Sequence, residues 1–394
     1  MRGSGAGSSW VRRNTDAPCT GSPPERVRDR QPLCSAGRGG SEFSTAADEC
    51  DSGPADAPTT ERELSDRLAR AVATYWSLPD RDQRLTGAPG IELCPIKGRE
   101  AWVATLPEHA GRPAAFVKVF SDPTSFRREQ RGLAAGQAVV LQSLDARPVR
   151  VPLILSQIEA AQALVMERVE GTVLGTRIRR DLVLRDRYVP ALAALGTWLA
   201  RFHAQDCPTG RHSEVLDRQL SFIRSTLEQA EPRLGSARTK QAGRLLARLG
   251  EELATHRRPL RWCHGDFQPD NIIVSGRTLF VVDFAFSDGG WPEQDLVLLR
   301  HNLRTGLSDL PFGSRAAQLL WSAFLTGYRE VCEDACDPRT WDLCELRYQS
   351  FSVRWKSYLY EQSARRKVLS FVRYVLGVRR FKRWLDSRVR VYGL

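Results

Sequence analysis

One segment constrains the fold of this chain more than any other: Cys-His-Gly-Asp-Phe-Gln-Pro-Asp-Asn at 263–271, with Asp283-Phe284 further along. Two short apolar runs, 272–274 and 279–282, follow it and are separated by Ser-Gly-Arg-Thr, a composition typical of turns. This pattern predicts a β-hairpin. Such a hairpin would bring Asn271 and Asp283 side by side.

Three side chains around this hairpin carry chemistry. Phosphoryl transfer requires a carboxylate that orients the acceptor hydroxyl and takes its proton, together with oxygen ligands for Mg²⁺ on the phosphates. Asp266 is placed to be the base, and Asn271 and Asp283 to be the metal ligands. The spacing therefore predicts a phosphoryl-transfer site.

The pattern His-Gly-Asp-x-x-x-x-Asn followed by Asp-Phe resembles the catalytic and metal-binding loops of the aminoglycoside phosphotransferase and choline kinase group. The resemblance implies a two-lobed, protein-kinase-like α+β fold with a small β-rich N-lobe and a mostly helical C-lobe. It also implies ATP and Mg²⁺ as cofactors, with Asp266 as catalytic base and Asn271 and Asp283 on the metal. It spans about 90–300 and is strong only at 263–295.

A lysine in a predicted strand extends the resemblance to the nucleotide. Strand-like runs at 101–106 and 114–120 precede a predicted helix at 125–133. In the kinase-like fold a strand lysine binds the α- and β-phosphates and is held by a helix glutamate. The resemblance assigns these roles to Lys118 and Glu129, and the alternative is an ordinary exposed lysine.

Two further parts of the nucleotide site have weaker signals. The run 163–171 resembles the strand and hinge that join the lobes, so the backbone at Met166, Glu167 and Arg168 is expected to meet the adenine. The segment 96–100 offers one glycine where protein kinases have a glycine-rich loop. A phosphate-covering loop and a plain surface turn are both open for it.

The helical periodicity predicts several helices. One starts with the capping-box pattern at 61 and ends before Pro79, one spans 190–205, and a helical block covers 221–253. We expect structural roles for His203 and His264. We expect Asp295 to anchor a loop or cap a helix.

Composition suggests four regions. Residues 1–60 are rich in Gly, Ser, Pro, Asp and Arg and predict disorder. An N-lobe at 61–170 and a C-lobe at 171–350 follow, with an extension at 351–394. A chain of 394 residues suits two lobes with extensions.

The extension holds most of the positive charge. Residues 351–394 contain twelve basic and two acidic residues, against a net charge of +12 for the whole chain, and their apolar residues recur at helical spacing. Three interpretations stay open: a docked helix with a solvated basic face, a membrane-surface anchor at 365–394, and nucleic-acid binding. The last is the least favoured because no nucleic-acid module accompanies it.

We expect the protein to be cytoplasmic. If the segment 365–394 is a membrane-surface anchor, the protein would lie at the inner face of the membrane. Nine scattered cysteines favour free thiols in a reducing compartment, and the spacing of Cys332, Cys336 and Cys344 does not match paired zinc ligands. No apolar run reaches the roughly 18 residues of a membrane span, and the first residues do not resemble a signal peptide.

These features predict an ATP- and Mg²⁺-dependent phosphotransferase that acts on a hydroxyl of a small molecule, such as a sugar or glycolipid. One alternative is a nucleotide-binding pseudokinase or scaffold, which would not need Asp266, Asn271 and Asp283 together. A second is an aminoglycoside-type antibiotic kinase, but nothing in this basic chain indicates the acidic pocket that a cationic acceptor would favour. A protein kinase is disfavoured because the chain has His-Gly-Asp in place of His-Arg-Asp.

Overall fold

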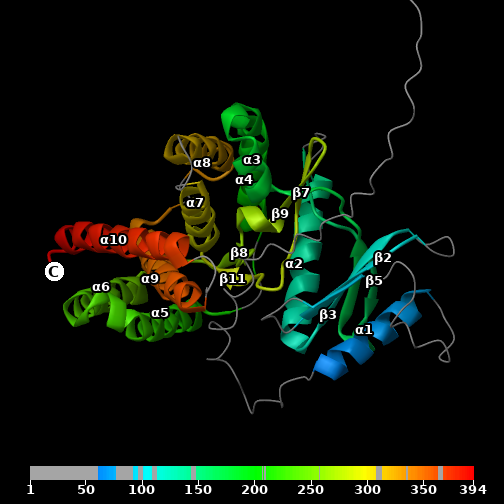
Figure 1. The fold of residues 1–394 in the computed structure, drawn as a ribbon, viewed down its shortest axis with the longest axis horizontal. Helices are drawn as coiled ribbons and strands as arrows, with labels where there is room; N and C mark the ends of the chain where they lie inside the picture. Colours follow the sequence, from blue (N-terminus) through cyan, green and yellow to red (C-terminus); the bar gives the residue numbers. More distant parts are fainter. Residues whose placement is uncertain are drawn as a thin grey trace, which may run out of the picture. The chain divides into compact units, whose positions relative to one another are not determined.

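The computed structural model describes residues 61–76, 92–95, 101–108, 113–142, 148–205, 207, 210–256, 258–307, 313–333, 336–362 and 367–394. The predicted disordered region 1–60 and the candidate phosphate loop 96–100 lie outside these ranges. The fold is α+β, with most of its strands before residue 174 and mostly helices after it (Figure 1).

Five antiparallel strands form the first sheet, in the order β1-β2-β3-β6-β5. They are β1 (Glu92–Pro95), β2 (Ala101–Leu106), β3 (Ala115–Phe120), β5 (Ile154–Ile158) and β6 (Ala163–Glu167), and the 3₁₀ turn η3 (Glu159–Ala161) links the last two. The strands predicted at 101–106 and 114–120 are therefore confirmed.

Alternation along β3 places its side chains on two different faces. Ala115, Val117 and Val119 pack with helix α1 (Glu61–Trp76), which begins at the predicted residue 61. Phe116, Lys118 and Phe120 take the alternate positions and face helix α2 (Pro123–Gln142). The alternation of side chains along the strand therefore places Lys118 on the side of the sheet that faces α2.

The predicted hairpin is present as β9 (Ile272–Ser275) and β10 (Thr278–Val281). It belongs to a four-stranded sheet with β4 (Val149–Arg150) and β7 (Thr172–Val173), in the order β4-β10-β9-β7. A separate short pair joins β8 (Arg261–Cys263) to β11 (Asp288–Gly290). The segment 264–271 lies between β8 and β9 and includes the 3₁₀ turn η5 (Pro269–Asn271).

Most helices after α1 pack into two large hydrophobic cores. The core that includes the hairpin also contains residues of α3 (Leu174–Arg180), the 3₁₀ segment η4 (Leu182–Tyr188), α4 (Val189–His203), α7 (Glu293–Leu307) and α8 (Gly313–Arg329). The other is built mainly by α5 (His212–Leu234), α6 (Ser236–Thr255), α9 (Pro338–Gln362) and α10 (Lys367–Val391). The helical block predicted at 221–253 is helical except at Gly235, whose φ of +86° divides it into α5 and α6.

The C-terminal basic helix is docked. Its apolar residues Phe381, Leu385 and Val389 are buried in the core formed with α5, α6 and α9. The first of the three interpretations, a docked helix with a basic outer face, therefore describes this part of α10. Among the described helices, none combines the length and the apolarity that crossing a membrane requires.

Helices α4 and α8 cross at unusually close range because glycines lie at the crossing. A Cβ placed on Gly196 would meet the Phe324 carbonyl oxygen at 2.0 Å, and one on Gly327 would meet the Ala193 carbonyl oxygen at 1.9 Å. Each backbone therefore fills the space of the side chain that the other lacks. This crossing holds His203 of α4 beside Tyr328 of α8.

The crossing yields a stability prediction with a matched control. Gly196→Ala forces the two backbones apart and is expected to lower the free energy of unfolding by about 1 to 3 kcal/mol. Gly243→Ala, in α6, has open space at its Cβ and is expected to raise it by about 0.4 to 1 kcal/mol. Urea denaturation of both variants measures the difference, and equal effects would contradict the close crossing.

Candidate active site

Lys118 lies between two carboxylates. Its Nζ is 2.7 Å from Glu129 Oε2 on α2 and 2.7 Å from Asp283 Oδ1, which follows β10. Lys118 and Glu129 are 4% and 1% exposed. Burial raises the pKa of the Glu129 carboxyl, and the adjacent Lys118 ammonium opposes that shift. The contact between Lys118 and Glu129 that the resemblance implied is therefore present, and Lys118 also forms an ion pair with Asp283.

A cavity of about 250 Å³ opens beside this ion pair. Its wall includes six of the residues singled out in the sequence, namely Lys118, Glu129, Met166, Glu167, Asn271 and Asp283. Apolar side chains complete the wall, including Val103, Phe116 and Ile273 from the two sheets and Leu133 from α2. An apolar slot with a few converging polar groups is typical of a small-molecule site.

Two predicted residues are not part of this wall. Arg168 lies just past β6 and forms an ion pair with Glu170, with a closest N to O distance of 3.6 Å. Asp266 is buried in the loop before η5, where it contacts Asn271. Asp266 therefore contacts the cavity wall through Asn271, whereas the Arg168 side chain is not part of the wall.

Two amides hold the Asp266 carboxylate. Gln268 Nε2 donates to both carboxylate oxygens, at 2.9 and 3.1 Å, and Asn271 Nδ2 donates to Oδ2 at 2.8 Å. Sequence reasoning missed Gln268. A signal was available, because a residue two positions after the aspartate in a tight loop can reach back to the same carboxylate.

Asp283 adopts a backbone conformation that is uncommon for a residue with a side chain, with φ +68°. Such conformations cost on the order of 1–3 kcal/mol and persist only where the surroundings enforce them. Here the carboxylate is held by Lys118, and the neighbouring Val282 N–H donates to the Asn271 carbonyl at 3.0 Å. The predicted proximity of Asn271 and Asp283 is confirmed.

The loop that carries Asp266 is fixed through its backbone. The N–H groups of His264 and Gly265 donate to the two oxygens of Asp295, at 2.6 and 2.9 Å. Burial lowers the pKa of His264, so its ring is neutral; Nε2–H donates to the Val282 carbonyl and Nδ1 accepts from the Asp266 N–H. Gly265 has φ +82°, and a Cβ there would meet the Phe286 carbonyl oxygen at 2.2 Å.

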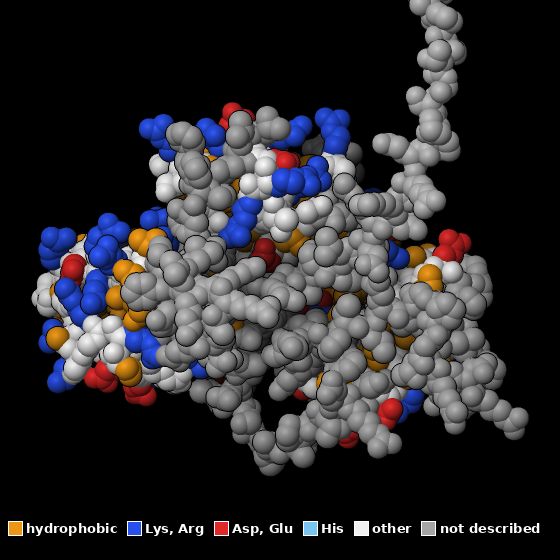
Figure 2. All heavy atoms as spheres, in the orientation of Figure 1, with side chains coloured by type: hydrophobic (Ala, Val, Ile, Leu, Met, Phe, Trp, Pro, Cys, Tyr) orange, Lys and Arg blue, Asp and Glu red, His pale blue; other side chains and the backbone are white. Residues whose placement is uncertain are grey.

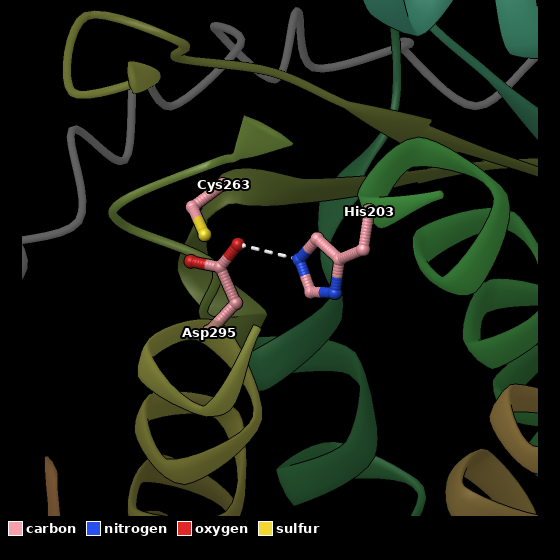
Figure 3. A group of neighbouring side chains, drawn as sticks. All are labelled: His203, Cys263 and Asp295. Carbon is pink, nitrogen blue, oxygen red and sulfur yellow. Dashed lines mark hydrogen bonds and ion pairs between the residues drawn. The ribbon is translucent and has the colours of Figure 1, made fainter. Parts of the chain in front are cut away.

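Asp295 also accepts a hydrogen bond from His203, whose Nε2–H donates to Oδ2 at 3.0 Å. The other ring nitrogen of His203, Nδ1, lies 2.8 Å from the Tyr328 hydroxyl. Figure 3 shows the carboxylate between this ring and the Cys263 thiol. One potential ligand atom from each of His203, Cys263 and Asp295 lies within 4.8 Å of the other two. Burial raises the pKa of the Cys263 thiol well above its usual range, which keeps it protonated. The cluster is therefore a hydrogen-bonded anchor, as expected for His203 and Asp295.

Oxygen ligands for a metal are present at the cavity instead. The Asn271 amide directs its nitrogen to Asp266, which leaves its carbonyl oxygen as a potential ligand, and the Asp283 carboxylate lines the same space. Carboxylate and amide oxygens are the donors that Mg²⁺ prefers. This donor set fits a hard divalent cation.

Removing the anchor is expected to weaken the fold without any involvement of metal. Asp295→Ala leaves two backbone N–H groups without their acceptor, at about 1 to 3 kcal/mol each. Asp217→Ala, an exposed carboxylate of α5, is the control and should change the unfolding free energy by about 0.5 kcal/mol or less. Chemical denaturation with and without EDTA measures both effects. A midpoint that falls on chelation and recovers with Zn²⁺ would contradict the hydrogen-bonded anchor.

Comparison with known proteins agrees with this geometry. The model of the phosphotransferase enzyme family matches residues 95–333, which is more than half of the chain. No curated protein matches the sequence.

Solved structures share the fold at low sequence identity. A glucosamine kinase in complex with glucosamine, ADP and inorganic phosphate is 17% identical, with a TM-score of 0.53, covering 86% of this chain and 89% of its own. Amicoumacin kinase hAmiN in complex with AMP-PNP, Ca²⁺ and Ami is 15% identical, with a TM-score of 0.50, covering 83% of this chain and 96% of its own.

The matched residues include the hairpin sheet, strands β2, β3, β5 and β6 of the first sheet, the Lys118–Glu129–Asp283 contacts and the Asp266 loop. The chain belongs to the phosphotransferase enzyme family and is a kinase that has an alcohol group as acceptor.

Proposed function

We propose that this protein transfers the γ-phosphoryl group of ATP to a hydroxyl of a small molecule, with Mg²⁺ as the metal and a sugar as the favoured acceptor class. The observation that carries the proposal is the chain of contacts from Asp266 through Asn271, and from Asp283 to Lys118, around one cavity. Base, metal ligands and phosphate-binding cation are thus adjacent. A pseudokinase or scaffold would not require them all.

The nucleotide would lie in the cavity between the two sheets. Its adenine would meet the backbone at 166–168, where β6 ends, and the apolar side chains of Val103, Phe116 and Leu133 would enclose it. Its α- and β-phosphates would accept from Lys118. Because Lys118 already has Glu129 and Asp283 as neighbours, its ammonium is held in place before the nucleotide arrives.

Asp266 would act as the base. Its carboxylate would accept the proton of the acceptor hydroxyl while that oxygen forms its bond to the γ-phosphorus and the bond to the bridging oxygen of ADP breaks. Gln268 and Asn271 fix the orientation of the carboxylate. These two amides would keep it aimed at the hydroxyl through the reaction.

Asn271 and Asp283 would hold Mg²⁺ through their oxygens. The metal would neutralise charge on the phosphates when bound. The ion pair between Asp283 and Lys118 places a negative and a positive charge side by side in the cavity. The Asp283 carboxylate would bind the metal, and the Lys118 ammonium would bind the phosphates.

The acceptor would meet polar groups of both charges around Asp288. Asp288, whose strand pairs with the strand before the Asp266 loop, lies 3.3 Å from a nitrogen of Arg128 on α2 and 4.0 Å from one of Arg218 on α5. Such a rim suits a polyhydroxyl compound better than a strongly cationic aminoglycoside. The glucosamine kinase structure is an example of a sugar acceptor on this fold.

A glycolipid acceptor at a membrane has no comparable support. In the described part of α10 the large apolar residues Phe381 and Leu385 are fully buried in the core. They are therefore not available for insertion between lipids. A soluble acceptor is the simpler proposal.

Replacing the base should remove the activity. Asp266→Asn is expected to lower the rate of acceptor-dependent ATP consumption by about 10²- to 10⁴-fold, because the acceptor hydroxyl loses its proton acceptor. The measurement is an ATP-consumption assay over sugars, choline-like amines, aminoglycosides and lipid-linked saccharides. Asp270→Asn, an exposed carboxylate in the same loop, should retain most of the activity.

Nucleotide binding, followed by calorimetry with AMP-PNP and Mg²⁺, should persist in both variants. If the wild-type protein bound AMP-PNP but showed no activity beyond that of Asp266→Asn on any acceptor, the pseudokinase alternative would replace this proposal. Phosphorylation of an aminoglycoside with no turnover of sugars would overturn the acceptor class alone.

A further inference from the structure

A second cavity, with a polar lining, lies among α7, α8 and α10, and none of its described lining residues belongs to the active site. Its volume is about 430 Å³, within the range of small-molecule sites. Three arginines line it, Arg300 and Arg304 from α7 and Arg380 from α10, and none of the described residues that line it is acidic. Figure 2 shows Lys and Arg side chains gathered over the α8 and α10 regions.

Helical spacing explains how the cavity is built. Arg300 and Arg304 are four residues apart, so they lie on one face of α7. From α8, Ser314, Gln318 and Trp321 recur at helical spacing and line the facing wall. Arg380 closes the cavity from the docked C-terminal helix. Three separate segments thus converge on one space.

Part of the wall is rigid. Arg300 is held by an ion pair to the buried Glu345 at 2.9 Å, and its guanidinium carbon lies 5.5 Å from the centre of the Trp341 ring. The Trp321 ring stacks on Phe324 with 5.6 Å between ring centres. A fixed guanidinium and a fixed indole face are therefore present before any ligand binds, which reduces the entropy lost on binding.

Arg304 is the adaptable part. Its side chain is exposed, and among the described residues it has no hydrogen-bond or ion-pair partner. An unpaired guanidinium next to a fixed one, with serine hydroxyls and an amide opposite, offers many donors and few acceptors. Guanidinium groups match phosphate oxygens two at a time.

We propose that this cavity binds a phosphate monoester, with the phosphate on Arg300, Arg304 and Arg380 and the organic part against Trp321. A dianion suits three guanidinium groups, one of which, Arg300, is paired with Glu345, better than a single carboxylate does. Enclosure by three helices limits the ligand to a small molecule or a lipid headgroup.

The cavity is distinct from the active site. Its lining includes none of Lys118, Asp266, Asn271 and Asp283. Arg300 and Arg304 lie five and nine residues beyond Asp295 on the same helix, or roughly 7 and 13 Å along its axis at the α-helical rise. Ligand in this cavity would therefore contact the helix that anchors the Asp266 loop without occupying the catalytic site.

Calorimetric titration with glycerol 3-phosphate tests the proposal, with AMP-PNP and Mg²⁺ present to fill the nucleotide site. Wild-type protein should bind, and Arg304→Ala should weaken binding at least about tenfold because a charge-assisted hydrogen bond is lost. Gln318→Glu, which places a carboxylate in the cavity, should weaken it similarly. Arg315→Ala is the control: Arg315 is an exposed arginine of α8 that does not line the cavity, and the variant should bind as wild type does.

Two further arms identify the source of the phosphate and the site. Wild-type protein should bind glycerol 3-phosphate equally well with and without AMP-PNP and Mg²⁺, which separates this cavity from the active site even if the protein proves to be a pseudokinase. Flotation with phosphatidylcholine vesicles containing phosphatidic acid tests the lipid source, and binding lost in Arg304→Ala would assign the cavity to a headgroup. Absence of binding to both probes, or binding that Arg304→Ala and Gln318→Glu leave unchanged, would overturn the proposal.

Discussion

The Asp295 carboxylate joins the start of α7 to the loop after β8 and to helix α4. It accepts from two successive backbone N–H groups of the loop after β8, and from a histidine of α4 that also contacts α8. Because the carboxylate is completely buried, each of these bonds forms in a low-dielectric interior, where an unpaired partner would be costly. The position of the Asp266 loop therefore depends on the α4–α8 crossing and on the start of α7.

A second constraint acts across the two halves of the fold. Lys118 comes from the first sheet, Glu129 from α2, and Asp283 from the end of the hairpin in the other sheet. A buried lysine requires neighbouring negative charge to remain an ammonium ion. The charges that keep Lys118 ionised therefore also tie strand β3 to Asp283, one of the two candidate metal ligands. Asp283 keeps its uncommon backbone conformation within this arrangement.

The sequence was most informative where local spacing determines geometry. The hairpin, the strand around Lys118 and the helix carrying Glu129 follow from periodicity and turn composition. The pairing of Lys118 with Glu129 was implied by the resemblance to the kinase family, and the structure contains that contact. The contact between Lys118 and Asp283 joins residues 165 positions apart and depends on how the two sheets pack. No local pattern predicts that distance.

Other features depended on tertiary packing in the same way. Gln268 was missed, because its bonds to Asp266 depend on the shape of the folded loop. The basic C-terminal segment gave three open interpretations, since its periodicity could not say which surface would cover its apolar residues. Docking against α5, α6 and α9 decided the matter for Phe381 and Leu385. The division of one predicted helical block at Gly235 likewise reflects a backbone conformation that the periodicity around it conceals.

Gly265 limits how this loop can evolve. Its φ of +82° disfavours every residue with a side chain, and the Phe286 carbonyl occupies the place that a Cβ would take. Protein kinases carry arginine at the corresponding position of His-Arg-Asp. In this chain the exchange of glycine for arginine would require the segment at Phe286 to move first, so no single substitution leads from one loop to the other. The two kinds of loop are separated by backbone geometry as well as by the side chain.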